Sequence, residues 1–259
     1  EAVFDFPGCG SERLFSQVGL ATLAMLYEVG AETVLPPGYL CCGYPQLSGG
    51  DRAKGHDISV NNQVLFHRVA NTLNYLDIKT VLVSCGTCLD QLLTYQFQQI
   101  FPGCRIMDIH EYLMEQGVRL DGDGRRYLYH DPCHTPIKRH NPVQVARTLM
   151  GSEVALSDRC CGESGTFAIS RPDIATQVKH RKQQELARGV AEDGNGEGGR
   201  TTVLTTCPSC LQGLSRYRDE VPVDADYIVT RLATERLGPD WQRDFLERVK
   251  RGGVERVLL

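Results

Sequence analysis

Short apolar runs alternate with longer amphipathic stretches along the whole chain. Three apolar runs in the first half predict strands, at residues 2–6, 33–35 and 80–84. Between them, apolar residues recur at helical spacing, which predicts helices over about residues 12–29 and 53–76. A further helix is expected to begin near Cys88.

The second half repeats this order of elements. Its apolar runs predict strands at residues 126–130, 154–156 and 202–206. Helical patterns cover residues 142–150 and 172–188, and Pro208 stands at a favoured first-turn position of one more helix. Because strands alternate with helices, we expect parallel sheets joined by right-handed crossovers. The predicted fold class is α/β, with two pseudo-symmetric repeats that each form a small parallel sheet flanked by helices.

Two segments interrupt the pattern. Residues 117–126 include the run Asp-Gly-Asp-Gly and predict a linker, so we expect one domain over residues 1–120 and a second over 121–259. Residues 189–200 hold five glycines without apolar periodicity and predict a mobile surface loop. The basic run at residues 179–182 is expected to form the solvated face of an amphipathic helix.

Ten of the 11 cysteines form one pattern that occurs twice. Each copy has a single cysteine, then Cys-Cys-Gly, then Cys-x-x-Cys. The first copy comprises Cys9, Cys41, Cys42, Cys85 and Cys88, and the second Cys133, Cys160, Cys161, Cys207 and Cys210. Matching positions lie 124, 119 and 122 residues apart, so the register hardly drifts. Because packing alone does not require thiols at repeating positions, this predicts a duplicated metal-binding unit.

The cysteine groups follow predicted strands. The carboxyl ends of parallel strands share one edge of a sheet, so each group of five can meet there. Each Cys-x-x-Cys also lies at a helix start, where unpaired N–H groups favour thiolates. Gly43 and Gly162 would let the backbone approach a bulky cofactor and donate their amides to its sulfur.

The number of thiols bears on the identity of the metal. Zinc prefers four ligands and would leave one thiol of each five unused, whereas adjacent cysteines suit a larger cluster. Soft thiolates without a recurring histidine favour iron–sulfur clusters or zinc over hard cations, and both remain open. Structural disulfides fit less well, because the cysteine count is odd and no secretion signal is visible. Reduced thiols in a cytoplasmic setting are therefore expected.

Composition limits the partners. The 41% hydrophobic and 23% charged residues are ordinary for a globular protein, and the net charge of -4 gives no reason to expect nucleic acid as a partner. No apolar run approaches the roughly 20 residues of a membrane span. The chain begins at Glu1 rather than Met, which suggests a segment of a longer protein or a processed or engineered start.

These motifs resemble the cysteine-rich (CCG) domain family, which includes the CCG-bearing subunit of heterodisulfide reductase and the iron–sulfur subunits of glycolate, lactate and anaerobic glycerol-3-phosphate dehydrogenases. The resemblance covers nearly the whole chain. It includes Pro-Gly-Cys at 7–9, Asp-Pro-Cys-His at 131–134, Cys-Pro-Ser-Cys at 207–210 and the residues after the second Cys-Cys-Gly. The gap between Cys133 and Cys160 is shorter than that between Cys9 and Cys41, so the second copy departs from the first in spacing.

The resemblance implies that each set of five cysteines holds a 4Fe-4S cluster of the non-cubane type. Some relatives lose cysteines in one half and bind zinc there or nothing, whereas this chain keeps all ten. No ferredoxin-like cysteine run occurs in the sequence, and no Gly-x-Gly-x-x-Gly loop for a dinucleotide lies between a predicted strand and a predicted helix. The resemblance therefore implies an FAD-containing dehydrogenase domain or subunit and a ferredoxin-like iron–sulfur domain, upstream or on another chain, and a quinone or other electron carrier as acceptor.

Three functions follow as hypotheses. The first is an electron-transfer part of a flavin-linked oxidoreductase of the D-lactate or glycolate dehydrogenase type, in the cytoplasm or peripheral to the inner face of the membrane. The second is disulfide cleavage at a non-cubane cluster, as in heterodisulfide reductase. The third is a zinc-stabilised interaction module.

Other residues have plainer interpretations. Cys104 is expected to be a buried apolar residue, Trp241 a packing anchor and His134 a hydrogen-bonding loop residue. Glu163 is expected to be an exposed turn acid. His110 and His130 are expected at a helix start or strand end rather than as metal ligands.

Overall fold

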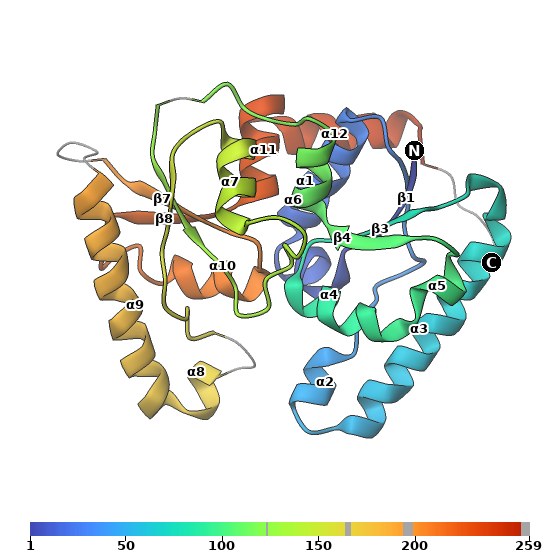
Figure 1. The fold of residues 1–259 in the computed structure, drawn as a ribbon, viewed down its shortest axis with the longest axis horizontal. Helices are drawn as coiled ribbons and strands as arrows, with labels where there is room; N and C mark the ends of the chain where they lie inside the picture. The colour runs from blue at the N-terminus through green and yellow to red at the C-terminus, as the bar shows by residue number, and fades with distance from the viewer. Residues whose placement is uncertain (123, 164–166, 194–198, 255–259) are drawn as a thin grey trace.

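The computed structural model describes the chain except for residues 123, 164–166, 194–198 and 255–259. It contains two four-stranded parallel sheets with the strand orders β2-β1-β3-β4 and β6-β5-β7-β8 (Figure 1). The first sheet consists of β1 (Ala2–Phe6), β2 (Glu32–Val34), β3 (Thr80–Val83) and β4 (Arg105–Asp108). The second consists of β5 (Tyr127–His130), β6 (Val154–Leu156), β7 (Thr201–Thr205) and β8 (Val223–Tyr227). The α/β prediction with two pseudo-symmetric repeats is confirmed.

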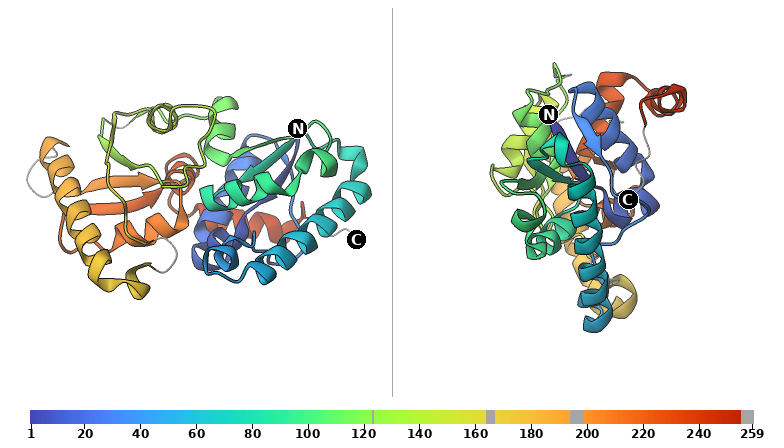
Figure 2. Two further views of the ribbon diagram at one scale, coloured as in Figure 1. Left: turned by 60° about the horizontal axis from the view of Figure 1, so that its bottom comes forward. Right: turned by 90° about the vertical axis from the view of Figure 1, so that its right-hand side faces the viewer.

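Helices cover both faces of each sheet. Those of the first repeat are α1 (Ser16–Glu28), α2 (Tyr44–Ser48), α3 (Arg52–Thr72), α4 (Gly86–Leu92), α5 (Phe97–Ile100) and α6 (Ile109–Glu115). Those of the second are α7 (Pro142–Met150), α8 (Phe167–Ser170), α9 (Pro172–Asp193), α10 (Pro208–Ser215), α11 (Ile228–Leu237) and α12 (Trp241–Arg251). Long helices occupy opposite ends of the molecule, α3 at one end and α9 at the other (Figures 1 and 2).

A shared layer of helices joins the two sheets. Helices α1 and α6 of the first repeat pack against α11 and α7 of the second between the sheets. The largest buried cluster accordingly draws on both repeats, with Val18 and Met25 from α1 and Leu232 from α11. Helix α12 continues this contact, since the Arg248 guanidinium lies 5.0 Å from the centre of the Tyr27 ring. The repeats therefore share a core and are not independent of one another.

The strands read as apolar runs because both sheet faces are buried. Val3 of β1 belongs to the shared core. Its neighbour Phe4 is buried on the opposite face of the sheet, where its ring centre lies 5.1 Å from that of Phe66 of α3. Such two-sided burial is typical of parallel sheets covered by helices. It fixes the register, in which Phe6 of β1 pairs with Val83 of β3.

Several boundaries differ from the sequence prediction. The predicted helix over residues 12–29 is interrupted at Phe15, whose φ of -131° lies outside the helical region, so a π-helical turn (Gly10–Leu14) precedes α1. Helix α9 continues to Asp193, so the loop predicted from residue 189 was wrong in its first part, and residues 194–198 lie outside the described residues. In the predicted linker, the described residues 117–122 and 124–126 form no helix or strand.

The apolar pattern did not reveal β4 and β8. These edge strands carry polar residues, and β8 reads Val-Asp-Ala-Asp-Tyr. Among the described helices, none combines the length and the apolar character that a membrane span requires.

Candidate metal centre

The cysteines gather where the strands end. Cys9 follows β1, and Cys85 and Cys207 directly precede α4 and α10 as their N-cap residues. Both N-cap cysteines have extended backbone angles, so at each of these residues the backbone changes directly from strand to helix. The Cys85 thiolate accepts hydrogen bonds from the backbone N–H groups of Thr87 and Cys88. The expected positions at the carboxyl edge and at the helix starts are confirmed.

All five thiols of the first copy converge. The Cys41 thiol hydrogen-bonds with those of Cys9 and Cys42. Cys42 in turn hydrogen-bonds with Cys88, and Cys88 with Cys85. Cys42 and Cys88 are buried, whereas Cys9, Cys41 and Cys85 are half-buried. We call this group, Cys9, Cys41, Cys42, Cys85 and Cys88, the first thiol set.

Proton sharing within the first thiol set shifts its pKa values in opposite directions. Hydrogen bonds from Cys42 and then Cys9 lower the pKa of Cys41 to about 2. The same contact with Cys41 raises the pKa of Cys42 to about 12. Some thiols are thus held as thiolates by neighbours that keep their protons. A metal that binds thiolates would replace those protons.

The two glycines of the Cys-Cys-Gly runs donate their backbone amides to cysteine sulfurs. The Gly43 amide donates to Cys41 Sγ at 3.4 Å, and the Gly162 amide donates to Cys160 Sγ at 3.3 Å. Gly43 has a φ of 90°, and a Cβ there would lie 2.9 Å from the carbonyl oxygen of Gly55. A side chain at this position would therefore separate the loop from α3, which explains the glycine.

The second thiol set, Cys133, Cys160, Cys161, Cys207 and Cys210, is less closed. The Cys161 and Cys210 sulfurs lie 3.3 Å apart, and these thiols also hydrogen-bond with Cys160 and Cys207 respectively. Cys133 is exposed, and its charge is among the influences that raise the pKa of Cys160. Four thiols therefore meet, and the fifth lies beside them on the surface.

The two sets touch each other. The largest influence on Cys85 is a hydrogen bond with the Cys207 thiol, which lowers the pKa of Cys85. The carboxyl edges of the two sheets therefore come together at this contact. Nine thiols thus form one continuous chain of contacts across both repeats, from Cys9 to Cys160.

Backbone contacts around this junction are related by the pseudo-symmetry. Gly10, which follows Cys9, lies against the Pro208 ring, which follows Cys207. Gly86, which follows Cys85, lies against the carbonyl group of His134, which follows Cys133. Each Cys-x-x-Cys helix therefore begins on the first-cysteine loop of the other repeat.

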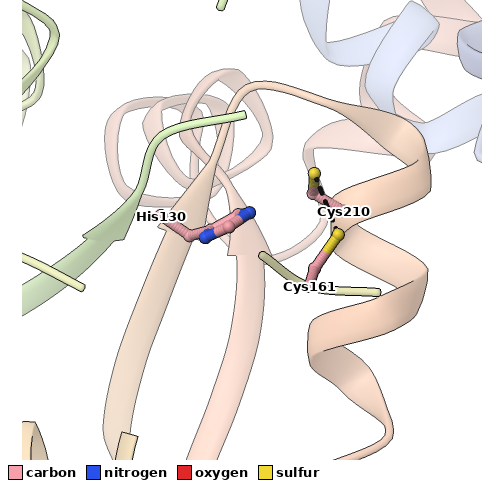
Figure 3. A group of neighbouring side chains, drawn as sticks. All are labelled: His130, Cys161 and Cys210. Carbon is pink, nitrogen blue, oxygen red and sulfur yellow. Dashed lines mark hydrogen bonds between the residues drawn. The ribbon is translucent and has the colours of Figure 1, made fainter. Parts of the chain in front are cut away.

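Sequence reasoning missed the role of His130. The residue does end β5 as expected, but one of its ring nitrogens and the sulfurs of Cys161 and Cys210 lie within 4.8 Å of one another (Figure 3). Figure 3 shows the ring directed toward the two thiols. The comparison of the two copies carried a signal, because Phe6 stands at the matching strand end of the first repeat.

The expectation that residues 179–182 form a solvated face was wrong for Lys182. Its side chain is fully buried, although Arg181 beside it is exposed. The loop after β6 covers Lys182 and supplies two carbonyl oxygens as acceptors, from Ser157 at 2.9 Å and Asp158 at 2.6 Å. Backbone acceptors can hold a buried ammonium that helical periodicity alone assigns to solvent.

Remaining predictions are mixed. Cys104 and Trp241 are buried as expected. His134 is a hydrogen-bonding residue, with Nδ1 2.6 Å from an Asp90 carboxylate oxygen and Nε2 3.2 Å from the Tyr44 hydroxyl. His110 lies in the first turn of α6, fully buried.

Glu163 is not an exposed turn acid. It is half-buried and forms an ion pair of 2.7 Å with Arg216. Burial is the largest cause that raises its pKa.

Comparison with known proteins identifies the repeated unit. The family described as a cysteine-rich domain (CCG) matches residues 3–93 and 127–215, and a domain of unknown function matches residues 215–259. A subunit of fumarate reductase (CoM/CoB) from Methanothermobacter marburgensis is 27% identical over 79% of this chain and 40% of its own length. An uncharacterized iron-sulfur protein from Methanocaldococcus jannaschii is 26% identical over 88% of this chain and 45% of its own.

Lactate utilization protein A from Oceanobacillus iheyensis is 26% identical over 72% of this chain and 81% of its own length. The chain therefore spans less than half of the length of the first two relatives and most of the third.

Proposed function

The chain belongs to the cysteine-rich (CCG) domain family, and we propose that it is the iron–sulfur, electron-transferring part of a flavin-linked oxidoreductase. In this proposal each thiol set holds one 4Fe-4S cluster. The carrying observation is the convergence of nine of the ten predicted cysteines into two adjacent sets that touch at Cys85 and Cys207, with Cys133 beside them on the surface. When bound, such clusters accept and release single electrons.

The donor chemistry of both sets fits clusters. The first thiol set offers five soft ligands, partly as thiolates, and the Gly43 amide as a hydrogen-bond donor to sulfur. The second offers four converging thiols and the Gly162 amide, and Cys133 would have to move inward to complete it. Zinc is the alternative in either set, with four ligands sufficing.

The remaining assignments are also proposals. We assign residues 1–120 and 121–259 to the two repeats, and FAD to another domain or subunit of the D-lactate or glycolate dehydrogenase type. A ferredoxin-like iron–sulfur domain would deliver the electrons, and a quinone or other carrier would take them. The names of relatives in lactate utilization and fumarate reduction support an oxidoreductase setting. A cytoplasmic or membrane-peripheral location is consistent with this setting.

Metal analysis tests the proposal. Protein purified without oxygen should contain about eight iron and eight sulfide per chain, the content of two 4Fe-4S clusters. Cys42→Ala and Cys161→Ala should each alter the electron paramagnetic resonance (EPR) spectrum of one cluster. Cys104→Ala is the matched control, because Cys104 is buried outside both sets and should leave the spectrum unchanged. One or two zinc ions without acid-labile sulfide would refute the proposal.

A second function is favoured by the facing arrangement of the sets. Electrons held at two adjacent sites could cleave a disulfide, which consumes two electrons and two protons and yields two thiols. A cavity of about 160 Å³ beside Cys161, with Lys179, Arg216 and Tyr217 in its wall, offers space for a substrate. Turnover of a disulfide by the dithionite-reduced protein would support this function, and electron uptake without turnover would favour the first.

A further inference from the structure

Lys182 is a buried cation that contacts His130, the histidine beside the second thiol set. Lys182 has no solvent exposure, and its Nζ lies 2.9 Å from Ser157 Oγ and 3.1 Å from His130 Nδ1, besides the two carbonyl oxygens described above. Lysine is almost never fully buried unless its charge is compensated. Glu185 and the thiols of Cys161 and Cys210 are among the groups that favour its charged form. The site therefore holds positive charge next to sulfur.

Lys182 also sets the orientation of His130. The two carbonyl oxygens can only accept hydrogen bonds, so Nζ must donate to them. As an ammonium it has three N–H groups to share among these oxygens, Ser157 Oγ and His130 Nδ1, and it cannot accept, so Nδ1 is the acceptor and the ring proton is on Nε2. His130 Nε2 is buried and has no hydrogen-bond partner among the described residues, and the ring faces Cys161 and Cys210 (Figure 3). An N–H group is thus aimed at the sulfurs of the second set.

The first thiol set has neutral residues at the corresponding places. Phe6 pairs with Val83 at the end of its strand, as His130 pairs with Thr205. Asn62 of helix α3 lies beside the first Cys-Cys-Gly loop, and its side-chain amide donates a hydrogen bond to the Cys41 carbonyl oxygen at 2.7 Å. The two sets therefore match in number of thiols but differ in the charge and polarity of their walls.

We propose that Lys182 and His130 make a cluster in the second thiol set the more easily reduced of the two. This rests on the proposed function. Reduction adds one negative charge, which a buried cation and an N–H donor to sulfur stabilise. Because Lys182 is buried, water and salt screen its charge poorly. The electron would come from the flavin-linked donor proposed above.

The pKa of Lys182 is consistent with an ammonium. Burial is the largest influence and lowers the pKa to about 8, against the favourable effect of nearby negative groups. The charged form therefore predominates at neutral pH.

Reduction potentials of the two clusters test the inference. In the purified protein, an EPR-monitored redox titration should resolve two potentials, which the Cys42→Ala and Cys161→Ala variants assign to the sets. Lys182→Met should make reduction of the second cluster at least about tenfold less favourable, a shift of about 59 mV for one electron. The first potential should stay within error. Arg181→Met is the matched control, because it removes an exposed cation one residue away.

A second pair of variants separates charge from hydrogen bonding. His130→Phe copies the first repeat and should lower the second potential, whereas His130→Gln keeps an N–H donor and should lower it less. These variants also serve if Lys182→Met fails to fold. Equal potentials in the unmodified protein, or equal shifts of both clusters, would overturn the inference alone. Zinc in place of iron and sulfide would overturn the proposed function as well.

Discussion

Replacing Gly86 by alanine should push the two repeats apart locally. A Cβ at Gly86 would lie 1.5 Å from the carbonyl oxygen of His134 and 3.0 Å from the backbone nitrogen of Pro136. Carbon and oxygen normally approach no closer than about 3.3 Å. The loop that carries Cys133 would have to retreat by nearly 2 Å, because backbone atoms cannot rotate away as a side chain can.

The expected cost follows from this overlap. Overpacking usually costs about 1–3 kcal/mol, and alanine in a helix gains up to about 1 kcal/mol over glycine. We therefore expect Gly86→Ala to lower the free energy of unfolding by about 2 kcal/mol. Gly10→Ala is the matched control, since its Cβ would meet only the Pro208 ring, at 3.0 and 3.1 Å. That ring can shift by a few tenths of an ångström, so the change should stay within about 1 kcal/mol.

Urea unfolding of the metal-free, reduced protein measures both variants. The midpoint should fall for Gly86→Ala at unchanged slope. Hydrogen exchange should quicken in residues 131–140 of this variant only. Equal costs for the two variants, or unaltered exchange in that loop, would refute the reasoning that backbone contact joins the repeats at the thiol junction.

Two further predictions concern buried polar groups. Burial raises the pKa of Asp5 from 3.8 to about 7, so the folded state holds a proton that the unfolded state has lost, and stability should fall by up to about 4 kcal/mol as pH rises from 4 to 7. Asp5→Asn should flatten this slope in urea unfolding at several pH values. Asn62→Ala should cost about 2 kcal/mol, because the Cys41 carbonyl and Tyr95 hydroxyl lose their donor, whereas exposed Asn61→Ala should cost nearly nothing.

Features that depend on residues close together in the sequence could be predicted from it. Strands β1 and β3 are buried on both faces, so their apolar runs were recognisable. The Cys-x-x-Cys pairs fell at helix starts because strand, thiol and helix follow each other within a few residues. Strand β8 was not predicted, because its side chains form no apolar run. Its backbone hydrogen bonds with β7 are what make it a strand.

Features that depend on the packing of distant segments could not be predicted. The contact between Cys85 and Cys207 accompanies the packing of α1 against α11, two helices that are far apart in the sequence and belong to different repeats. The burial of Lys182 depends on carbonyl oxygens of Ser157 and Asp158 in a separate loop. No helical period encodes either contact.

The shared core constrains how the two thiol sets can act. Buried residues from α1 and α11 belong to one cluster between the sheets, so the sets could separate only if that cluster opened. Opening a packed core is costly, because tightly packed interiors do not deform continuously. The spacing of the sets is therefore fixed by the fold. Apart from the exposed position of Cys133, the two sets differ in the residues that surround them, with His130 and Lys182 beside the second set and Phe6 and Asn62 beside the first.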